Sequence, residues 1–222
     1  MKEKWNKEKA VAKWDKYYHK KNWLARMIDV IIEIYFSKVF EKDLKRITKG
    51  IKGDIIELGC GSGIMSSRLA KQGYNVSVLD ISQNALNAAK QNFGKLKAKG
   101  AFIKADLFSM KLKKESYGIV WNQGVIEHFD DIEGAVREMN RLVAKNGYLM
   151  IFVPAYNSPL HMVYRTLSLL NLKSLWPFDD QIFLKKKQLF IIMENAGVKS
   201  IRVRRVKGSL FFSLVGYSRK FR

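Results

Sequence analysis

Apolar and polar positions recur along this chain with two different periods, and the changes of period mark its elements. Residues 3–22 fit a polar helix that carries tryptophan, and residues 24–47 fit a second helix with a wide apolar face. The apolar face repeats at helical spacing through Leu24, Met27, Ile28, Ile31, Ile32, Tyr35, Phe36, Val39 and Phe40. We therefore expect residues 1–50 to form an N-terminal helical extension or lid, and residues 51–222 to form the main domain.

Beyond Gly53, short apolar runs alternate with helical segments. The expected strands are Asp54–Leu58, Asn75–Asp80, Ala101–Ala105, Tyr117–Asn122 and Tyr148–Val153. The expected helices between them are 62–72, 82–93 with Ser82 as N-cap, and 131–144, which Asn146-Gly147 would end. Strands and helices alternating at this spacing predict an α/β fold with a doubly wound, mostly parallel sheet.

The last third of the chain departs from this alternation. Pro159–Leu172 and Lys185–Ala196 fit helices, and Gly197 would close the second one. Two β-rich runs, Val198–Val206 and Ser209–Tyr217, flank Lys207-Gly208 and predict an antiparallel hairpin. We expect this hairpin to complete a seven-stranded sheet, and residues 155–190 to form a helical insertion.

One glycine-rich run carries the first chemical signal: Glu57-Leu58-Gly59-Cys60-Gly61-Ser62-Gly63, between an expected strand and an expected helix. Such a turn lets a nucleotide-like ligand approach the backbone and a helix N-terminus. A dinucleotide fingerprint needs glycine at its first, third and sixth positions, whereas Ile64 fills the sixth position here. With an acid two residues before its first glycine, the run resembles motif I of the class I S-adenosylmethionine-dependent methyltransferases.

This resemblance implies a Rossmann-like methyltransferase fold and S-adenosylmethionine as the cofactor, bound outside the carboxyl ends of the strands. Gly59, Cys60, Gly61 and Gly63 would let the backbone approach the amino acid part of the cofactor. Glu57 would anchor the turn, or make a water-mediated contact to the cofactor's amino group.

Acids end the next two expected strands. Asp80 could accept both hydroxyls of a ribose, or it could merely help to cap the following helix. By the family resemblance, Asp106 would face the adenine amine, with Leu107 or Ile81 packed on the ring. The alternative for Asp106 is a solvated loop acid.

The fourth expected strand ends in the run Trp121-Asn122-Gln123-Gly124-Val125-Ile126-Glu127-His128-Phe129. It resembles the small-molecule branch of the family, in which a polar residue at the strand end is followed by a Glu-His pair. Asn122 and Gln123 would lie near the reactive methyl, and Glu127 and His128 at the mouth of the acceptor pocket. His128 could take a proton from a hydroxyl, orient the acceptor, or be structural. We expect no metal.

The acceptor is constrained by the fourth strand and by the insertion. The Asp/Asn-Pro-Pro-aromatic run typical of methylation on a base amine is absent. The insertion could be an interfacial element, a lid over a lipophilic acceptor, or part of the core. Its apolar residues are Leu160, Met162, Val163, Leu167, Leu169, Leu170, Leu172, Leu175, Trp176 and Phe178, followed by Lys185, Lys186 and Lys187. We expect a small-molecule acceptor, as in the quinone-biosynthesis O-methyltransferases that the chain resembles; an RNA methyltransferase and a non-catalytic partner subunit are the alternatives.

The formal net charge of +21 is unevenly distributed. Residues 1–50 carry about +7, residues 53–153 about +3 and residues 154–222 about +10. The basic flanks could be solvated surface, or could bind an anionic membrane surface or, less favoured, nucleic acid. Cys60 is the only cysteine, which favours a reducing, cytoplasmic location. Because no apolar stretch is long enough to span a bilayer, we expect any membrane association to be peripheral. The sequence indicates no oligomeric state.

Overall fold

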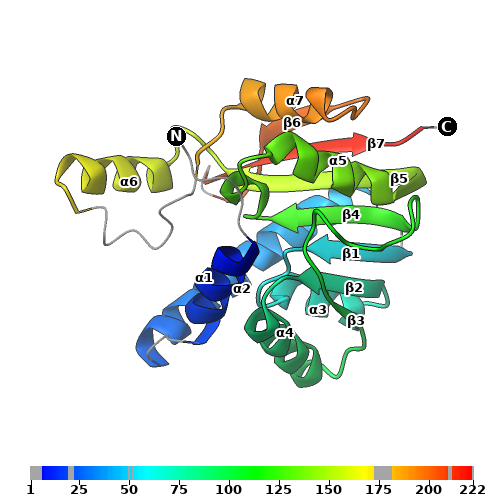
Figure 1. Ribbon diagram of the computed structural model, residues 1–222, viewed down its shortest axis with the longest axis horizontal. Helices are drawn as coiled ribbons and strands as arrows, with labels where there is room; N and C mark the ends of the chain where they lie inside the picture. Colours follow the sequence, from blue (N-terminus) through cyan, green and yellow to red (C-terminus); the bar gives the residue numbers. More distant parts are fainter. Residues whose placement is uncertain are drawn as a thin grey trace.

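The structure is a computed structural model that describes residues 7–19, 23–49, 51, 53–172, 182–209 and 212–221 (Figure 1). Its helices are α1 (Lys7–His19), α2 (Trp23–Ile47), α3 (Ile64–Lys71), α4 (Gln83–Lys95), the short 3-10 helix η1 (Ile126–His128), α5 (Ile132–Leu142), α6 (Pro159–Leu169) and α7 (Lys186–Asn195). Its strands are β1 (Asp54–Leu58), β2 (Asn75–Asp80), β3 (Ala101–Lys104), β4 (Tyr117–Gln123), β5 (Val143–Pro154), β6 (Arg202–Arg205) and β7 (Ser213–Arg219).

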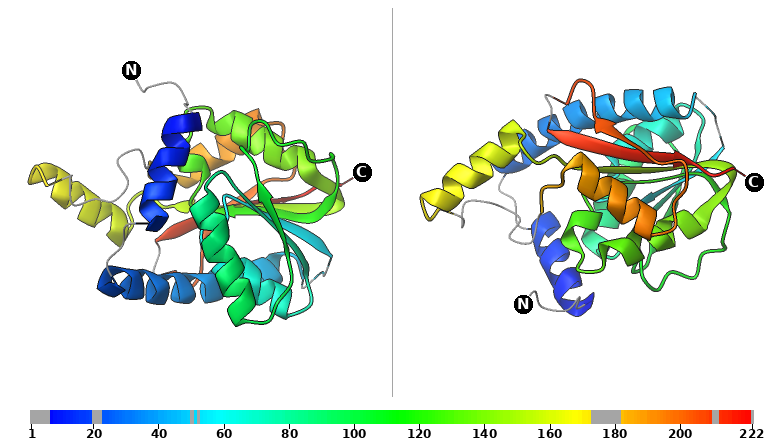
Figure 2. Two further views of the ribbon diagram at one scale, coloured as in Figure 1. Left: turned by 60° about the horizontal axis from the view of Figure 1, so that its bottom comes forward. Right: turned by 90° about the horizontal axis from the view of Figure 1, so that it is seen from above.

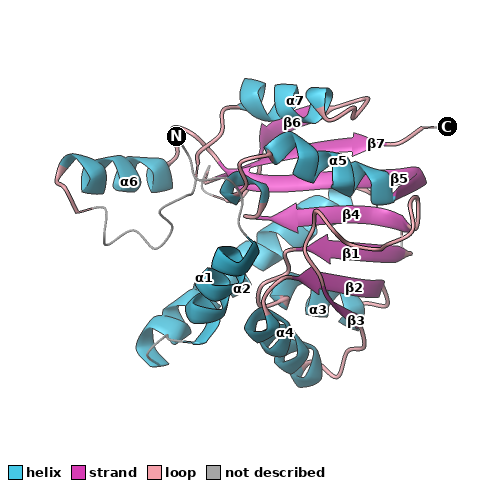
Figure 3. Cartoon of the chain, in the orientation of Figure 1, coloured by secondary structure: helices cyan, strands magenta, loops and turns pink. Residues whose placement is uncertain are grey.

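The described strands form one seven-stranded sheet in the order β3-β2-β1-β4-β5-β7-β6 (Figure 3). The strands β1 to β5 pair in parallel, whereas β7 lies antiparallel to both β5 and β6. The expected fold class and the expected hairpin are therefore confirmed. Because the strand order reverses between β1 and β4, the carboxyl ends of β1 and β4 flank the point where open α/β sheets bind their ligands.

Helices cover both faces of this sheet. On one face α2, α3 and α4 enclose a core cluster that includes Phe40, Leu69 and Phe93. On the other face α5 and α7 pack through residues such as Met139 and Leu189. The helix α1 lies beside α4 at the edge of the ligand-binding end, and α6 extends away from the body of the protein (Figure 2).

The structure corrects the predicted boundary before β5. Asn146-Gly147 does not end a helix, because α5 already ends at Leu142 and β5 begins at Val143. The C-terminal segment pairs with the first part of β5: the Asn146 N–H donates to the Lys220 carbonyl over 2.7 Å, and the Lys220 N–H donates to the Gly147 carbonyl over 2.9 Å. Long-range strand pairing places this segment in the sheet despite its turn-forming sequence. Asn146 alone keeps a turn-like, left-handed conformation, with φ of 61°.

The predicted apolar face of the second helix is correct only in part. Phe40 is buried, but Tyr35 is 45% exposed and uses its hydroxyl to donate to the Gly208 carbonyl over 2.8 Å. The side chains of Leu24, Met27, Ile28, Ile31 and Ile32 lie outside the described residues, as do Leu175, Trp176 and Phe178 of the insertion. None of the described helices is long and apolar enough to cross a membrane.

Candidate active site

The glycine turn between β1 and α3 can be built only with glycine at two of its positions. Gly59, Gly61 and Gly63 all have left-handed φ angles, of 70°, 51° and 60°. A Cβ on Gly59 would lie 2.5 Å from a methyl of Val125, and one on Gly63 would lie 2.9 Å from the Cβ of Ala89. The turn therefore brings bare backbone to the carboxyl end of the sheet, where a ligand can approach it closely.

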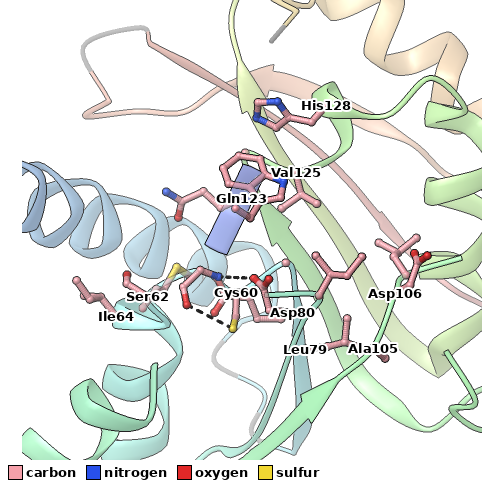
Figure 4. Close-up of a pocket in the computed structure, with 18 of the residues that line it drawn as sticks. Cys60, Ser62, Ile64, Leu79, Asp80, Ala105, Asp106, Gln123, Val125 and His128 are labelled. Atoms are coloured by element: carbon pink, nitrogen blue, oxygen red, sulfur yellow. Dashed lines mark hydrogen bonds between the residues drawn. The ribbon is translucent and has the colours of Figure 1, made fainter. Parts of the chain in front are cut away.

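Asp80, the last residue of β2, points at this turn (Figure 4). Its Oδ2 accepts the Gly61 N–H and its Oδ1 accepts the Ser82 N–H, each over 2.9 Å. Burial raises the pKa of the Asp80 carboxyl, and nearby Asp15 adds to the effect, while the backbone N–H donors oppose it. Each carboxylate oxygen still has a second acceptor position, so Asp80 can brace the turn and also accept hydroxyls of a ligand. The cap of α4 is Ser82, whose Oγ accepts the Ala85 N–H, as predicted.

Two further acids belong to the same cavity. Glu57, buried on β1, accepts a hydrogen bond from Ser66 on α3 over 2.5 Å, which fixes the strand to the helix across the turn. Asp106 follows β3 and accepts the Phe108 N–H through Oδ1 over 3.0 Å. At 8% exposure Asp106 is not a solvated loop acid.

The cavity runs along the carboxyl ends of β1, β2 and β4. Most of the residues predicted from the sequence line it: Glu57, Gly59, Cys60, Gly61, Asp80, Ile81, Asp106, Leu107, Gln123 and His128. Gly63 is not among the lining residues, although it completes the turn. In Figure 4, Gln123 and Val125 lie between the glycine turn and His128.

Besides Gly63, two predicted residues do not line this cavity. Asn122 is completely buried and lies next to Gln123 on β4, where successive side chains point to opposite faces of the sheet. Glu127 is also completely buried, and it lines an adjoining pocket instead. His128 and Glu127, which the sequence placed together at the acceptor, therefore face different spaces.

Residues 56–151 match the methyltransferase domain family. Together with the relatives and the solved structure described next, this match supports a class I, S-adenosylmethionine-dependent methyltransferase. The resemblance that the glycine run indicated is thereby confirmed.

The methyltransferase domain is similar to the ubiquinone biosynthesis O-methyltransferase of Pelagibacter ubique (strain HTCC1062), with 29% identity over 121 residues, which are 54% of this chain and 48% of that protein. It is also similar to a malonyl-[acyl-carrier protein] O-methyltransferase of Enterobacter lignolyticus (strain SCF1), with 26% identity over 104 residues, 47% of this chain and 40% of that protein. The chain thus spans about half the length of these relatives. Among solved structures, the magnesium protoporphyrin IX methyltransferase of Synechocystis PCC 6803 with bound SAH shares the fold at a TM-score of 0.66 and 19% identity, covering 96% of this chain and 95% of that one.

The charge of the cavity fits the cofactor of this family. Its described lining contains the carboxylates of Glu57, Asp80 and Asp106 and no lysine or arginine, in a chain whose net charge is +21. A cation such as a sulfonium is attracted to such a lining, whereas the pyrophosphate of a dinucleotide would be repelled. The bare glycine backbone and the apolar side chains of Ile81 and Leu107 suit the rest of an S-adenosyl group.

The methyltransferase domain receives one wall of its cavity from α1, which lies in the expected N-terminal extension or lid but contains none of the predicted site residues. Trp14 lines the cavity, and its ring meets that of His128 edge to face, with centroids 5.1 Å apart. Asp15 fixes the helix in place, since it accepts hydrogen bonds from the Ser82 hydroxyl and, over 3.3 Å, from the Asn84 N–H. The sequence contains one indication of this contact: a tryptophan in a lysine-rich helix. Such a large ring is usually buried against a partner outside its own helix.

Proposed function

We propose that this protein transfers the methyl group of S-adenosylmethionine to a small acceptor with an apolar body. The observation that carries this proposal is the cavity of three carboxylates and a bare glycine turn, without a basic side chain among its described lining residues. The relatives support a small acceptor group, because one is a ubiquinone biosynthesis O-methyltransferase and the other a malonyl-[acyl-carrier protein] O-methyltransferase.

In this proposal the cofactor supplies a methyl group already activated on a sulfonium, so the protein mainly has to bind, align and exclude water. Asp80 accepts the ribose hydroxyls, and Asp106 accepts from the adenine amine. Ile81 and Leu107 pack against the adenine ring. The amino acid part lies against the turn formed by Gly59, Cys60, Gly61 and Gly63, with Glu57 beneath it.

At the reacting end, Gln123 lines the cavity while Asn122 supports the sheet from the opposite face. His128 is placed to orient the acceptor or to take a proton from it. Its ring contacts that of Trp14, so α1 and the reacting end are in direct contact. No group of three or more His, Cys, Asp or Glu side chains that could hold a metal ion occurs in the described part of the chain.

We further propose that the protein works in the cytoplasm, at an anionic membrane surface. Support comes from α6, which extends from the body and exposes Met162, Val163, Leu169 and Leu170 to solvent at 65%, 53%, 78% and 62% (Figure 1). Lys185, Lys186 and Lys187 are exposed beside the base of this helix, where Lys185 lies over the Tyr156 ring. Exposed apolar residues next to basic ones are typical of interfacial elements.

Incubation with methyl-labelled S-adenosylmethionine and a cell extract tests the proposed activity. The label is then separated into lipid, small-molecule, RNA and protein fractions, with boiled protein as the control. We expect label in the small-molecule or lipid fraction. Label confined to RNA would replace the proposal with the RNA alternative, and no transfer above the boiled control would contradict it.

A further inference from the structure

The helix α6 is attached to the body of the protein at its first turn. Of its eleven residues, all of which the structure describes, only His161 is buried, at 6% exposure. Beyond this residue the helix extends away from the sheet (Figures 1 and 2). The apolar side chains that it exposes there are Met162, Val163, Leu169 and Leu170. The direction in which α6 presents them is therefore set near His161.

Two reciprocal hydrogen bonds close the first turn of α6. The Oγ of Ser158, the N-cap residue, accepts the His161 N–H over 3.1 Å. The His161 Nδ1 in turn accepts the N–H of Asn157, which has a left-handed φ of 55°, over 3.3 Å. The arrangement resembles a capping box in which a histidine replaces the usual glutamate or glutamine and accepts from the residue before the N-cap. Because Nδ1 is the acceptor, this arrangement requires a neutral imidazole.

Aromatic rings enclose the imidazole of His161. Its centroid lies 4.3 Å from that of Tyr156, in the turn after β5, and 4.8 Å from that of Phe183, ahead of α7. The Tyr164 ring of α6 lies 5.4 Å from that of Phe183, and Arg205 of β6 donates to the Tyr156 carbonyl over 3.1 Å. This enclosure shields His161 from water, which disfavours a charged imidazole.

The charged groups at this turn also favour a neutral imidazole. Burial lowers the pKa of His161, and the positive charge of Arg165, one turn further along α6, lowers it further. No carboxylate in the described part of the chain opposes these effects. Lys185, whose Nζ lies 4.8 Å from the centroid of the Tyr156 ring, and Arg205 are the other described charged groups at the turn, and both are cations.

We propose that His161 is a proton-operated hinge: the neutral imidazole fixes α6 to the body, and protonation releases the helix. A proton on Nδ1 turns the acceptor into a donor that faces the Asn157 N–H, so the hydrogen bond is lost and two donors oppose each other. Protonation also adds a cation to a buried position beside Arg165. The hinge contains no residue of the cofactor cavity, so this inference does not rest on the proposed methyl transfer.

The direction of the pKa shift sets the pH range in which the hinge responds. The pKa of His161 is lower in the folded protein than the ordinary value of 6.5, so the released helix binds the proton more tightly. The attachment is therefore fully formed above pH 6.5 and weakens as the pH falls below that value.

Two measurements on the unaltered protein test the hinge. NMR titration of the imidazole signals gives the pKa of His161, and the chain has only three histidines to assign. Hydrogen exchange, corrected for the intrinsic rate at each pH, gives the protection of the α6 backbone, with α5 as the reference. We expect a pKa below 6.5 and, from about pH 7.5 to about pH 5, an α6 protection lower by about fivefold, the usual effect of losing a cap, with α5 unchanged. A pKa at or above 6.5, constant α6 protection, or an equal loss in α5 would overturn the inference.

Two variants identify the group that titrates. Arg165→Gln removes the neighbouring cation and should raise the pKa of His161, whereas the matched change Arg137→Gln, at an exposed position of α5, should leave it unaltered. His161→Asn keeps an acceptor close to the position of Nδ1 but takes up no proton in this range, so its α6 protection should not depend on pH. An Asn variant as sensitive to pH as the unaltered protein would refute the hinge. Because the titration and Arg165→Gln leave His161 in place, an Asn variant that fails to fold leaves the test intact.

Discussion

Trp14 of the N-terminal helix and His128 at the end of β4 meet edge to face, with ring centroids 5.1 Å apart and an interplanar angle of 82°. Both rings line the proposed cofactor cavity, so this contact closes it between two segments that are far apart in the sequence. The helix is docked by Asp15 at the start of α4, next to Asp80. The helix that carries Trp14 is therefore attached next to Asp80, where we propose that the ribose binds.

Replacing Trp14 with alanine should weaken cofactor binding. Loss of the ring pair removes about 1 kcal/mol, which corresponds to roughly a fivefold rise in the Kd for S-adenosylhomocysteine. Calorimetry measures this Kd. Lys16→Ala is the control, because Lys16 is on the same helix and exposed. Equal affinities for the Trp14 variant and the unaltered protein would show that α1 takes no part in the site.

Gly59→Ala should destabilise the protein and abolish cofactor binding. Alanine would have to adopt a φ of 70° with its Cβ 2.5 Å from Val125, and strain of this kind costs about 1–3 kcal/mol before the contact is counted. Thermal unfolding should show a melting temperature lower by several degrees. Gly53→Ala, where a Cβ meets nothing within 4 Å, should leave the melting temperature unchanged. A Gly59 variant as stable as the Gly53 variant would contradict the geometry of the turn.

Cys60 should react slowly with iodoacetamide in the folded protein. Burial raises the pKa of its thiol well above the ordinary value of 9.0, and the negative charges of Asp80 and Glu57 raise it further. The reactive thiolate is therefore scarce at pH 8, and the alkylation rate should increase only as the pH rises beyond 9. Mass spectrometry follows the reaction, with the denatured chain as control. Similar rates for folded and denatured protein at pH 8 would refute this prediction.

The sequence was sufficient for the elements that a local pattern defines. The runs 54–58 and 75–80 were assigned as strands with their observed bounds, because buried parallel strands are short apolar runs between turn residues. The acid that ends β2 and the acid that follows β3 could then be predicted as site residues, since the carboxyl ends of parallel strands face the ligand site. The glycine run also predicts Gly63 as a cofactor-binding residue, whereas in the structure Gly63 belongs to the turn and does not line the cavity.

The remaining parts of the site depend on contacts between distant segments. Nothing near Trp14 indicates that α1 docks on α4, because the docking residue Asp15 pairs with Ser82 and Asn84. The pocket that adjoins the cavity combines Phe36 of α2, Phe152 of β5 and Phe212 before β7, which lie far apart in the sequence. The alternation of side chains along a strand could have excluded Asn122 from the cavity. Asn122 and Gln123 are neighbours on β4, so their side chains point to opposite faces of the sheet.

Charge reversal of Lys185, Lys186 and Lys187 should weaken binding to anionic vesicles. A basic residue near such a surface contributes about 1 kcal/mol, so the triple substitution to glutamate should reduce binding by at least about a hundredfold. Co-sedimentation with phosphatidylglycerol vesicles measures it. Reversal of Lys95, Lys97 and Lys99, which are exposed at and after the end of α4, makes the same change in net charge away from α6. If the two triple variants bind equally, the proposed membrane surface is wrong.

The most direct test of the account is a calorimetric titration of S-adenosylmethionine into the protein and into its Asp80→Asn variant. The carboxylate of Asp80 can brace the turn and accept the ribose hydroxyls, whereas an amide loses one of the acceptors that face the Gly61 and Ser82 N–H groups. Burial raises the pKa of Asp80, so its charge costs stability above that pKa, and the neutral variant should remain folded at pH 7. We predict one binding site in the unaltered protein and an affinity lower by at least about tenfold in the folded variant. Absence of binding to the unaltered protein, or equal affinity for both, would contradict the proposed cofactor site.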